Sequence, residues 1–309
     1  MDGYFKNKNV MLRKRIVYDD RVTCDGIFVY GSLVATRDLL GEKMIMCNDN
    51  YDFITKILTP HLDKLSQRRT TRYRKIIESG INNLAECGYI QKLELRDETV
   101  INTIPLYVYS DEEEKKVLNS IFKRINERGK VVKDDNLFFK TFSISISYDE
   151  LITITESYYK DMGKLLRLFL VIADGFYYSS WADADEMGKI CRMSVKRLLV
   201  NMNEEPSKTN TNKMSASDGY IQTLVSLNLI CYIKGGQRIA STKYNYQIRR
   251  VDEPNDYYRH SNWYARPCHK NELIRAVSIR RGWDFETLGR FVIDANTNSK
   301  VIEVESEED

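Results

Sequence analysis

The sequence lacks the residue patterns that hold metal ions. It has three histidines, and no two of them form a His-x-His pair. Its six cysteines are scattered and include no Cys-x-x-Cys pair, so we expect no zinc site. The dipeptide Cys268-His269 is isolated and offers too few ligands for a metal. Because most cysteines have apolar neighbours, we interpret them as small core residues in a reducing compartment.

Motifs of common enzymes are missing as well. There is no GxxxxGK[ST] phosphate loop, since Gly163-Lys164 is followed by Leu165 and lacks the upstream glycine. There is no GxSxG motif, and the acidic residues form no recognisable metal triad. Without a His-x-His pair, the two-histidine nuclease signature of rolling-circle initiators and relaxases is excluded. We therefore expect a protein that is not an enzyme and uses no cofactor, with an unfamiliar active-site arrangement as the alternative.

Long hydrophobic runs are also missing. No apolar run reaches the roughly 18 residues of a membrane span, and the first residues, MDGYFKNKNVMLRKRIVYDD, lack the apolar stretch of a signal peptide. We expect a cytoplasmic protein that does not associate with membranes. The chain of 309 residues is long enough for two globular domains. The net charge of +3 includes an acidic tail, VIEVESEED, so the remainder is more basic, which permits nucleic-acid binding.

What the sequence does contain is one plan that occurs twice. Residues 59–90 read TPHLDKL, SQRRTTR and YRKIIESGINNLAECGYI, and residues 194–230 read SVKRLLVNM, EEPSKTNTNK and MSASDGYIQTLVSLNLI. Each copy predicts a short helix, a basic linker rich in Thr or Asn, a second helix and a β-prone segment. That order is the plan of a winged helix. We therefore predict two winged-helix domains that bind double-stranded DNA.

The first domain is expected to span residues 21–109, after a basic arm over residues 1–20. Thr59-Pro60 marks a helix start, because Thr suits the N-cap and Pro the first helical position. Gly88 is placed to end the second helix. The expected elements are a helix at 26–40, a strand at 42–48, a short helical segment at 52–58, the two helices of the repeat, and a wing hairpin of 89–95 and 99–108.

Residues 110–150 are expected to connect the domains through a charged helix and a strand. Ser110 and Glu113 form a capping box at the start of this helix. The second domain is expected to span residues 151–251, followed by a helical extension with the acidic tail at 252–309. The expected elements are helices at 110–129, 158–173, 186–191, 194–202, 215–227, 270–281 and 284–293, and strands at 136–147, 231–234 and 238–248, the last two joined through Gly235-Gly236.

The strongest functional signal is the segment SQRRTTRYRK. Its cationic and hydroxyl side chains are Arg68, Arg69, Thr70, Thr71, Arg72, Arg74 and Lys75. Positive charge at a helix N-terminus opposes the helix dipole, and an anionic partner would remove the conflict. Cationic side chains together with N–H groups there form a phosphate site. The alternative is a solvated basic face with acidic partners in the same chain.

In the second copy, basic residues surround the equivalent position. They are Lys189, Arg192, Lys196, Arg197, Lys208 and Lys213, with Lys234, Arg238 and Lys243 in the expected wing. The Thr and Asn residues at 209–212 are suitable donors to bases and phosphates, and a mobile surface loop is the alternative. In the segment 257–270, YYRHSNWYARPCHK, aromatics alternate with basic residues, which suits base stacking. We favour the alternative interpretation, in which the segment is irregular and its aromatic residues anchor it to the domain.

The chain resembles the winged-helix replication initiators and replisome organisers of Gram-positive phages, plasmids and integrated elements. The resemblance rests on INNLAECGYI, IQTLVSLNLI and MGKICRMSVKRLL, and covers roughly half of the chain. It implies binding to repeated origin sites in double-stranded DNA, with replication proteins as partners. The linker at 204–213 is longer than in a compact winged helix, which leaves the recognition helix of the second domain open.

The expected fold is α+β and mainly α, with two tandem winged helices joined by a helix and a small helical C-terminal extension. The expected function is that of a non-enzymatic DNA-binding protein that initiates or organises replication of a mobile element. A winged-helix transcriptional regulator, acting at operator sites, and a protein-interaction scaffold are the alternatives. The sequence does not give the DNA site or the oligomeric state.

Overall fold

The computed structural model describes residues 8–41, 43–47, 54, 67–95, 98–107, 110–121, 123–125, 131–133, 142–157, 161–176, 189–235, 261–281, 285–289 and 291–297. The fold is α+β and mainly helical, as the sequence predicts. The chain divides into two compact units, one of Met1–Lys123 with Lys133–Val171 and the other of Arg124–Val132 with Ile172–Asp309. Each unit is described separately below.

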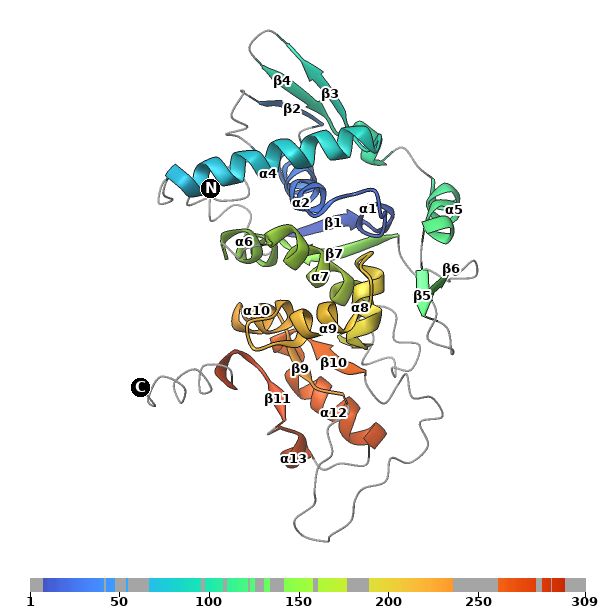
Figure 1. Cartoon of the computed structure of the whole chain (residues 1–309), viewed down its shortest axis with the longest axis vertical. Coiled ribbons are helices and arrows are strands. Elements are labelled where there is room, and N and C mark those ends of the chain that lie inside the picture. Colours follow the sequence, from blue (N-terminus) through green and yellow to red (C-terminus); the bar gives the residue numbers. More distant parts are fainter. Residues whose placement is uncertain are drawn as a thin grey trace. The chain divides into compact units, whose positions relative to one another are not determined.

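The first unit contains two small antiparallel sheets and a set of helices (Figure 1). Strands β1 and β7 form one sheet, and β2, β4 and β3 form the other in that order. The elements are β1 Asn9–Arg13, α1 Lys14–Val17, α2 Cys24–Leu40, β2 Met44–Cys47, α4 Gln67–Glu86, β3 Gln91–Glu94, β4 Thr99–Asn102, the 3-10 turn η2 Ile104–Tyr107, α5 Asp111–Ile121, β7 Ser143–Ser147, α6 Tyr148–Glu156 and the first part of α7 Met162–Gly175. Two short strands, β5 Lys123–Ile125 and β6 Val131–Lys133, pair with each other and belong mainly to the second unit.

Helix α2 lies at the centre of the first unit. Thr23 caps its start by accepting a hydrogen bond from the Gly26 N–H, and Gly41, with φ of 75°, ends it. Its side chains from Ile27 to Tyr30 have no exposed surface, and neither do those of Leu33 and Val34. The sequence predicts this helix at 26–40, and α4 packs across it (Figure 1). Burial on nearly all sides explains why α2 shows little amphipathic pattern.

The expected basic arm over residues 1–20 is wrong for its described part, residues 8–20. Strand β1 pairs with β7 in the register Val10 to Ile146 and Leu12 to Ile144, and all four side chains are buried. The basic residues that follow are buried as well: the Arg15 Nε donates to Glu114 Oε1 over 2.9 Å, with both side chains nearly inaccessible. The strand partner and the ion partner lie far away in the sequence, so the local pattern of charges gives no sign of either.

The second unit is built around a four-stranded antiparallel sheet in the order β11-β9-β10-β8. Helices α12 and α13 cover its core, where Trp263, Leu273, Val277 and Leu288 are buried together. The elements are β8 Ile190–Met193, α8 Val195–Asn201, α9 Lys208–Ser215, α10 Tyr220–Ser226, β9 Cys231–Ile233, β10 Asn262–Ala265, the 3-10 turn η3 Pro267–His269, α12 Lys270–Arg281, α13 Phe285–Gly289 and β11 Val292–Ile293. Helix α12 has the predicted bounds.

Both units repeat one order of elements. In the first unit a helix is followed by a strand, a long helix and a hairpin, and the three strands form a sheet of order β2-β4-β3. In the second unit the corresponding strands have the order β8-β10-β9. The helix ends match as well. Gly88 and Asn228 both have positive φ, of 75° and 55°. In each case the following N–H, of Tyr89 or Leu229, bonds a carbonyl in the last helical turn, that of Leu84 or Leu224. This is the Schellman arrangement at a helix C-terminus.

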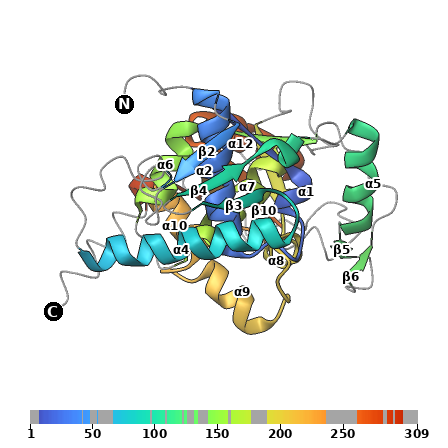
Figure 2. The ribbon, with the colours of Figure 1, turned by 90° about the horizontal axis from the view of Figure 1, so that it is seen from above.

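The two expected linkers of the repeat are helical in the structure. Helix α4 begins at Gln67, so the described part of the expected linker, QRRTTR, forms the first turns of this helix. In the second unit, α9 occupies most of the expected linker at 204–213, capped by the Ser207 hydroxyl. The expected single helix at 215–227 is correct only as α10, after a break at 216–219 (Figure 2). Local hydroxyl caps at Ser207 compensate for the poor helix propensity of a Thr/Asn run.

Three further boundaries differ from the sequence prediction. The expected helix at 186–191 is wrong where it is described, because 190–193 form strand β8, paired with β10. The expected helix at 110–129 ends at Ile121, although its Ser110/Glu113 capping box is confirmed. The expected helix at 284–293 consists of α13 and strand β11. Strands β8 and β11 pair only with strands that lie far away in the sequence, so local periodicity does not reveal them.

Several predictions lie outside the described residues. They are the helix start at 59–60, most of the segment 52–58, the strand at 238–248 and the acidic tail, and the described part of the strand at 136–147 is β7.

Candidate nucleic-acid interface

Helix α4 has one buried face and one solvent-exposed face. Tyr73, Ile77, Gly80, Ile81 and Leu84 are buried, at the spacing of a helix packed on a neighbour. The Tyr73 hydroxyl extends this packing, because it bonds the Thr155 carbonyl of α6. This packing therefore determines which face of α4 points to solvent.

The exposed face of α4 carries cations in its N-terminal half and acids further along. Thr71, Arg72 and Lys75 are exposed near the start, whereas Glu78 and Glu86 are exposed later. The first turn contains no acidic residue. Both trends oppose the helix dipole, which favours acids at the N-terminus and cations at the C-terminus. A bound anion at the N-terminal half would reverse this unfavourable arrangement.

The other predicted residues of this segment also lie on α4. Arg68 and Arg69 belong to its first turn, and their side chains are not described. Thr70 and Arg74 are half-buried. The structure therefore brings the whole predicted cluster onto one helix, with Thr71, Arg72 and Lys75 facing solvent.

Close helix approaches hold α4 in place. A Cβ on Gly80 would lie 2.4 Å from the Asp25 carbonyl oxygen of α2, and a Cβ on Gly26 would lie 2.5 Å from Asn83 Oδ1 of α4. On the opposite side of the same α2 turn, a Cβ on Gly163 of α7 would lie 2.0 Å from the Cys24 carbonyl oxygen. The start of α2 is thus held between two helices by residues that have no side chain.

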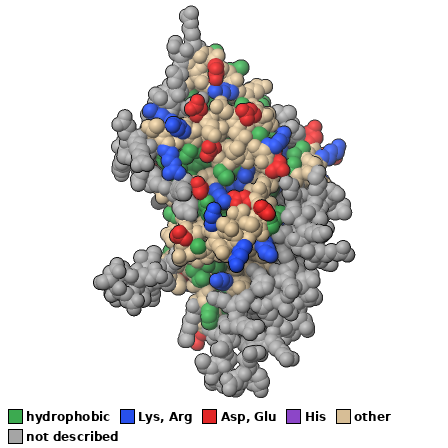
Figure 3. Space-filling view, viewed as in Figure 1, with side chains coloured by type: hydrophobic (Ala, Val, Ile, Leu, Met, Phe, Trp, Pro, Cys, Tyr) green, Lys and Arg blue, Asp and Glu red, His purple; other side chains and the backbone are tan. Residues whose placement is uncertain are grey.

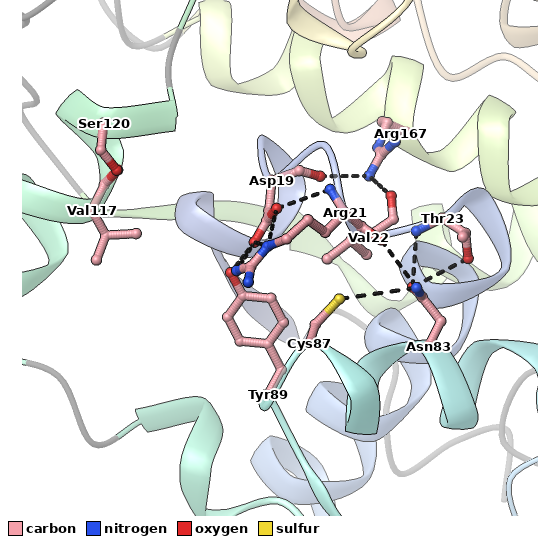
Figure 4. Close-up of polar contacts among 10 residues, drawn as sticks. All are labelled: Asp19, Arg21, Val22, Thr23, Asn83, Cys87, Tyr89, Val117, Ser120 and Arg167. Atoms are coloured by element: carbon pink, nitrogen blue, oxygen red, sulfur yellow. Dashed lines mark hydrogen bonds and ion pairs between the residues drawn. The ribbon is translucent and has the colours of Figure 1, made fainter.

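A polar network fixes the C-terminal half of α4 (Figure 4). The Asn83 side chain accepts a hydrogen bond from the Thr23 N–H over 2.8 Å and donates to the Arg21 carbonyl over 3.0 Å. The Tyr89 hydroxyl donates to Asp19 Oδ2 over 2.6 Å, and Arg21 pairs with the same oxygen over 2.6 Å. Sequence reasoning missed these positioning residues, because they form no linear motif and Asp19 falls in the expected arm.

The electrostatics of this network favour one protonation state. Burial tends to raise the pKa of Asp19, but the hydrogen bonds from Arg21 and Tyr89 outweigh it and the pKa is lowered overall. Burial and the bond to Asp19 raise the pKa of Tyr89, so the phenol remains a donor. Asp19 therefore stays a carboxylate that ties the end of α4 to the loop before α2.

The hairpin predicted in the first unit is confirmed for β3 and β4, and it is not basic. The Leu95 N–H bonds the Glu98 carbonyl at the base of the turn. The Lys92 ammonium pairs with Glu94 over 2.8 Å and donates to Asn82. The exposed side chains of the hairpin include Leu93 and Leu95. Phosphate contacts in this unit would therefore come from α4 more than from the described hairpin.

In the second unit the structure separates the predicted basic residues into two groups. Lys189 pairs with Glu272 of α12 over 3.3 Å, and the Arg192 guanidinium stacks over the Trp263 ring at 4.8 Å. These two have intramolecular roles. Arg197 is half-buried on α8. The exposed lysines are Lys196 on α8, Lys208 and Lys213 on α9, and Lys234 after β9, whereas Arg238 and Lys243 lie outside the described residues.

The aromatic-basic segment 257–270 packs into the second unit. Asn262–Ala265 form the inner strand β10, with Trp263 and Tyr264 buried. The prediction that its aromatics pack is confirmed for these two residues, and the prediction that the segment is irregular is wrong for this strand. Arg266 lies over the Phe176 ring at 5.1 Å. Trp263 and Tyr264 are therefore not available for base stacking.

The described residues contain no group of three or more His, Cys, Asp or Glu side chains that could hold a metal ion. Within the same ranges, none of the helices has the length and apolar content to cross a membrane.

Figure 3 shows acidic and basic side chains interspersed over the face in view. On the face in view, the basic side chains form no broad field of positive charge.

No model of a protein family, no curated protein sequence and no solved structure matches this chain.

Proposed function

We propose that the chain is a double-stranded DNA-binding protein with two winged-helix units. In the first unit α4 would enter the major groove, and the β3–β4 hairpin would be the wing. Support comes from the repeated element order and from the strand orders β2-β4-β3 and β8-β10-β9, which are those of a winged helix. The matched helix ends at Gly88 and Asn228 support the equivalence of the two units.

The observation that carries the proposal is the reversed charge of α4. Its exposed N-terminal half presents Arg72 and Lys75 beside Thr71, with no acid in the first turn. With respect to the helix dipole this arrangement is unfavourable, since each charge placed against the dipole costs about 0.3–1 kcal/mol. DNA phosphates bound beside these cations would offset this unfavourable charge placement. In helix-turn-helix proteins, the N-terminal residues of the recognition helix contact the base edges.

By the same alignment, we propose α9 as the DNA-contacting helix of the second unit. Counting back equally from Gly88 and Asn228 places α9 Lys208–Ser215 on the segment Arg68–Lys75 of α4. Helix α9 presents exposed Lys208, Thr209, Asn212 and Lys213. Asn and Thr side chains read base edges, whereas the arginines of α4 suit phosphates and guanine. In this proposal α4 contributes more of the affinity and α9 more of the base readout.

The biological role that we propose is initiation or organisation of replication of a plasmid, phage or integrated element, without enzymatic activity. Two winged helices in one chain suit an extended site of repeated sequence, and the resemblance of INNLAECGYI and IQTLVSLNLI to replication initiators points the same way. Replication of a plasmid that carries the cognate site, with the chain supplied in trans, tests this role. Repression of a promoter without replication would support a regulator instead.

The experiment that tests DNA binding compares matched charge removals by fluorescence anisotropy. One variant is Arg72→Ala with Lys75→Ala on α4, and the control is Lys115→Ala with Lys116→Ala, two exposed lysines of α5. The logarithm of the affinity for duplex DNA should fall linearly with the logarithm of the salt concentration, and the slope should decrease by about 0.9 for each lost phosphate contact. The control should keep the wild-type slope. A flat salt response, or equal effects of the two variants, would contradict the proposal.

A further inference from the structure

The exposed large hydrophobic side chains of the described residues gather at one sheet. Those on or beside β2, β3 and β4 are Met44, Met46, Leu93, Leu95 and Ile104, which are 50%, 60%, 53%, 58% and 48% exposed. Met11 on β1 is the other one, at 44%. Scattered apolar side chains on a surface need no explanation, but a cluster of this kind marks a binding surface.

Strand alternation places four of these side chains on one face of the sheet. Met46 pairs with Val100, and Val100 pairs with Leu93, so the three side chains form a row across the strands. Met44 lies on the same face as Met46, and Leu95 on the same face as Leu93. The opposite face, with Ile45 and Ile101, is buried. The outward face, defined by Met44, Met46, Leu93, Leu95 and Val100, is therefore apolar at its centre, where Val100 is only 8% exposed between the more exposed Met46 and Leu93.

The polar residues of the outward face lie at its two ends. At one end the Asn102 amide donates to Gln91 Oε1 over 2.9 Å, and the NH2 group of the exposed Gln91 is a further donor. At the other end Glu98 is exposed and shares the face of Val100 by alternation. The face thus has amide donors at one end, apolar side chains in the middle and a carboxylate at the other end.

We propose that the outward face binds the same face of a second copy of this chain, about a two-fold axis that crosses the strands. This axis stacks the apolar row on itself and places each Glu98 opposite the Asn102–Gln91 amides of the second copy. A two-fold axis along the strands would instead place the two Glu98 carboxylates opposite each other, which costs energy. The face is therefore self-complementary in charge about this axis, which favours a second copy of the chain as its partner. Two-fold pairing through one self-complementary patch is the commonest form of soluble oligomer.

The size of the face sets the strength of the contact. Three strands spaced about 4.8 Å apart form a narrow platform, smaller than the roughly 800 Å² per partner of a standard interface. We therefore expect association in the micromolar range. The two methionines suit such a contact, because their flexible thioethers adapt to an opposing apolar surface.

Sedimentation velocity of the full chain without DNA tests the proposal. The chain has a mass of 36.2 kDa. The weight-average mass of the wild type should rise from one chain toward two between about 1 and 100 µM. Met46→Lys and Leu93→Lys should each weaken the association at least about tenfold, because a buried, unpaired ammonium is costly. Met11→Lys, at the exposed methionine outside the face, should behave as the wild type.

A second variant tests the axis. Glu98→Gln should weaken the association a few-fold, because it removes a charge-assisted hydrogen bond to the amides of the second copy. If Glu98→Gln strengthens it, the axis along the strands is correct and the proposed one is wrong. A wild type that stays monomeric up to about 100 µM, or Lys variants that associate as the wild type, would overturn the proposal of a second copy. Circular dichroism of each variant at low concentration checks that it is folded.

Discussion

Single residues set the distance between the helices that position the candidate interface. Gly80, Gly26 and Gly163 bring α4 and α7 against the start of α2, where a Cβ atom would lie closer than 3.0 Å to a neighbouring oxygen. Backbone carbonyls cannot move away without shifting the helix. The spacing of α4 from α2 therefore depends on the absence of a methyl group at these positions.

We expect Gly80→Ala to destabilise the first unit by about 1–3 kcal/mol, the usual range for forcing an extra methyl into a packed site. Higher intrinsic helix propensity of Ala works in the opposite direction and is smaller, at about 1 kcal/mol. The measurement is thermal unfolding followed by far-ultraviolet circular dichroism. Ser79→Ala, at the exposed neighbouring position on α4, is the control and should leave the midpoint nearly unchanged. A Gly80→Ala chain as stable as the wild type would show that α2 and α4 are not tightly held.

A buried carboxylate provides a pH-dependent prediction for the second unit. Burial tends to raise the pKa of Asp294, but the bonds from Lys270 and Thr297 outweigh it and lower the pKa to about 2. A depressed pKa in the folded state stabilises the fold above the unfolded-state pKa of about 4, and this contribution disappears as the pH falls toward about 2. Asp294→Asn should therefore lower stability near neutral pH by about 1–2 kcal/mol, after allowance for solvent around Lys270.

Tryptophan fluorescence reports this effect directly, since Trp181, Trp263 and Trp283 all belong to the second unit. Denaturant midpoints of wild type and Asp294→Asn should converge as the pH is lowered from about 5 to about 2. Glu286→Gln, at an exposed position on α13, is the matched removal of one negative charge and should show no such convergence. A difference between wild type and Asp294→Asn that grows on acidification would contradict the role of the carboxylate.

At the scale of elements, the sequence predicts the amphipathic and locally capped segments well. Helix α12 is correct residue for residue, and α4 follows from Tyr73, Ile77, Ile81 and Leu84 at helical spacing. These elements are determined by neighbours within a few positions. Strands β1 and β10 were not predictable in this way, because their partners β7, β8 and β9 lie far away in the sequence. In the stretch VMLRKR, the charged residues obscure the strand alternation that buries Val10 and Leu12.

The candidate site shows the same division. The cluster Arg68–Lys75 was recognisable as a run of charge, but the intramolecular roles of Lys189 and Arg192 depend on Glu272 and Trp263, which come from other elements. Asn83 and Tyr89, which hold the end of α4, form no motif with Thr23 and Asp19. Charge composition alone therefore does not separate structural cations from those that face a ligand.

The second unit yields a prediction that distinguishes α9 from the cations around it. Lys208→Ala with Lys213→Ala removes two exposed charges of α9 and should lower duplex affinity by about tenfold or more at low salt, since two phosphate contacts are lost. Lys189→Ala should have little effect, because its ammonium is paired with Glu272. Anisotropy titrations of both variants give the comparison. If Lys189→Ala weakens binding more than the α9 variant, the DNA-contacting surface of the second unit lies elsewhere.

On the scale of the whole molecule, the two proposed repeats differ in chemistry. The long helix of the first unit is continuous and rich in arginine, whereas its counterpart is divided into α9 and α10 and presents Thr and Asn. The break at 216–219 is stabilised locally, since the Gly219 N–H bonds the Ala216 carbonyl and there is no room for a Cβ on Gly219 beside the Lys213 carbonyl. A repeated fold with unequal helices suits a protein whose two halves contact unequal parts of one extended site.

The proposed difference in DNA contacts between the two units predicts the outcome of a footprinting experiment on one DNA fragment. Arg72→Ala with Lys75→Ala should reduce protection in one part of the footprint, and Lys208→Ala with Lys213→Ala in another, because each pair belongs to a different unit. The α4 variant should weaken binding similarly on all sequences, as expected for phosphate contacts, whereas Asn212→Ala on α9 should relax the preference at its own base position by about 1–3 kcal/mol. The α5 variant Lys115→Ala with Lys116→Ala serves as the control and should leave the footprint intact. If both DNA-binding variants erase the same region, only one unit contacts DNA, and the second repeat then serves another purpose.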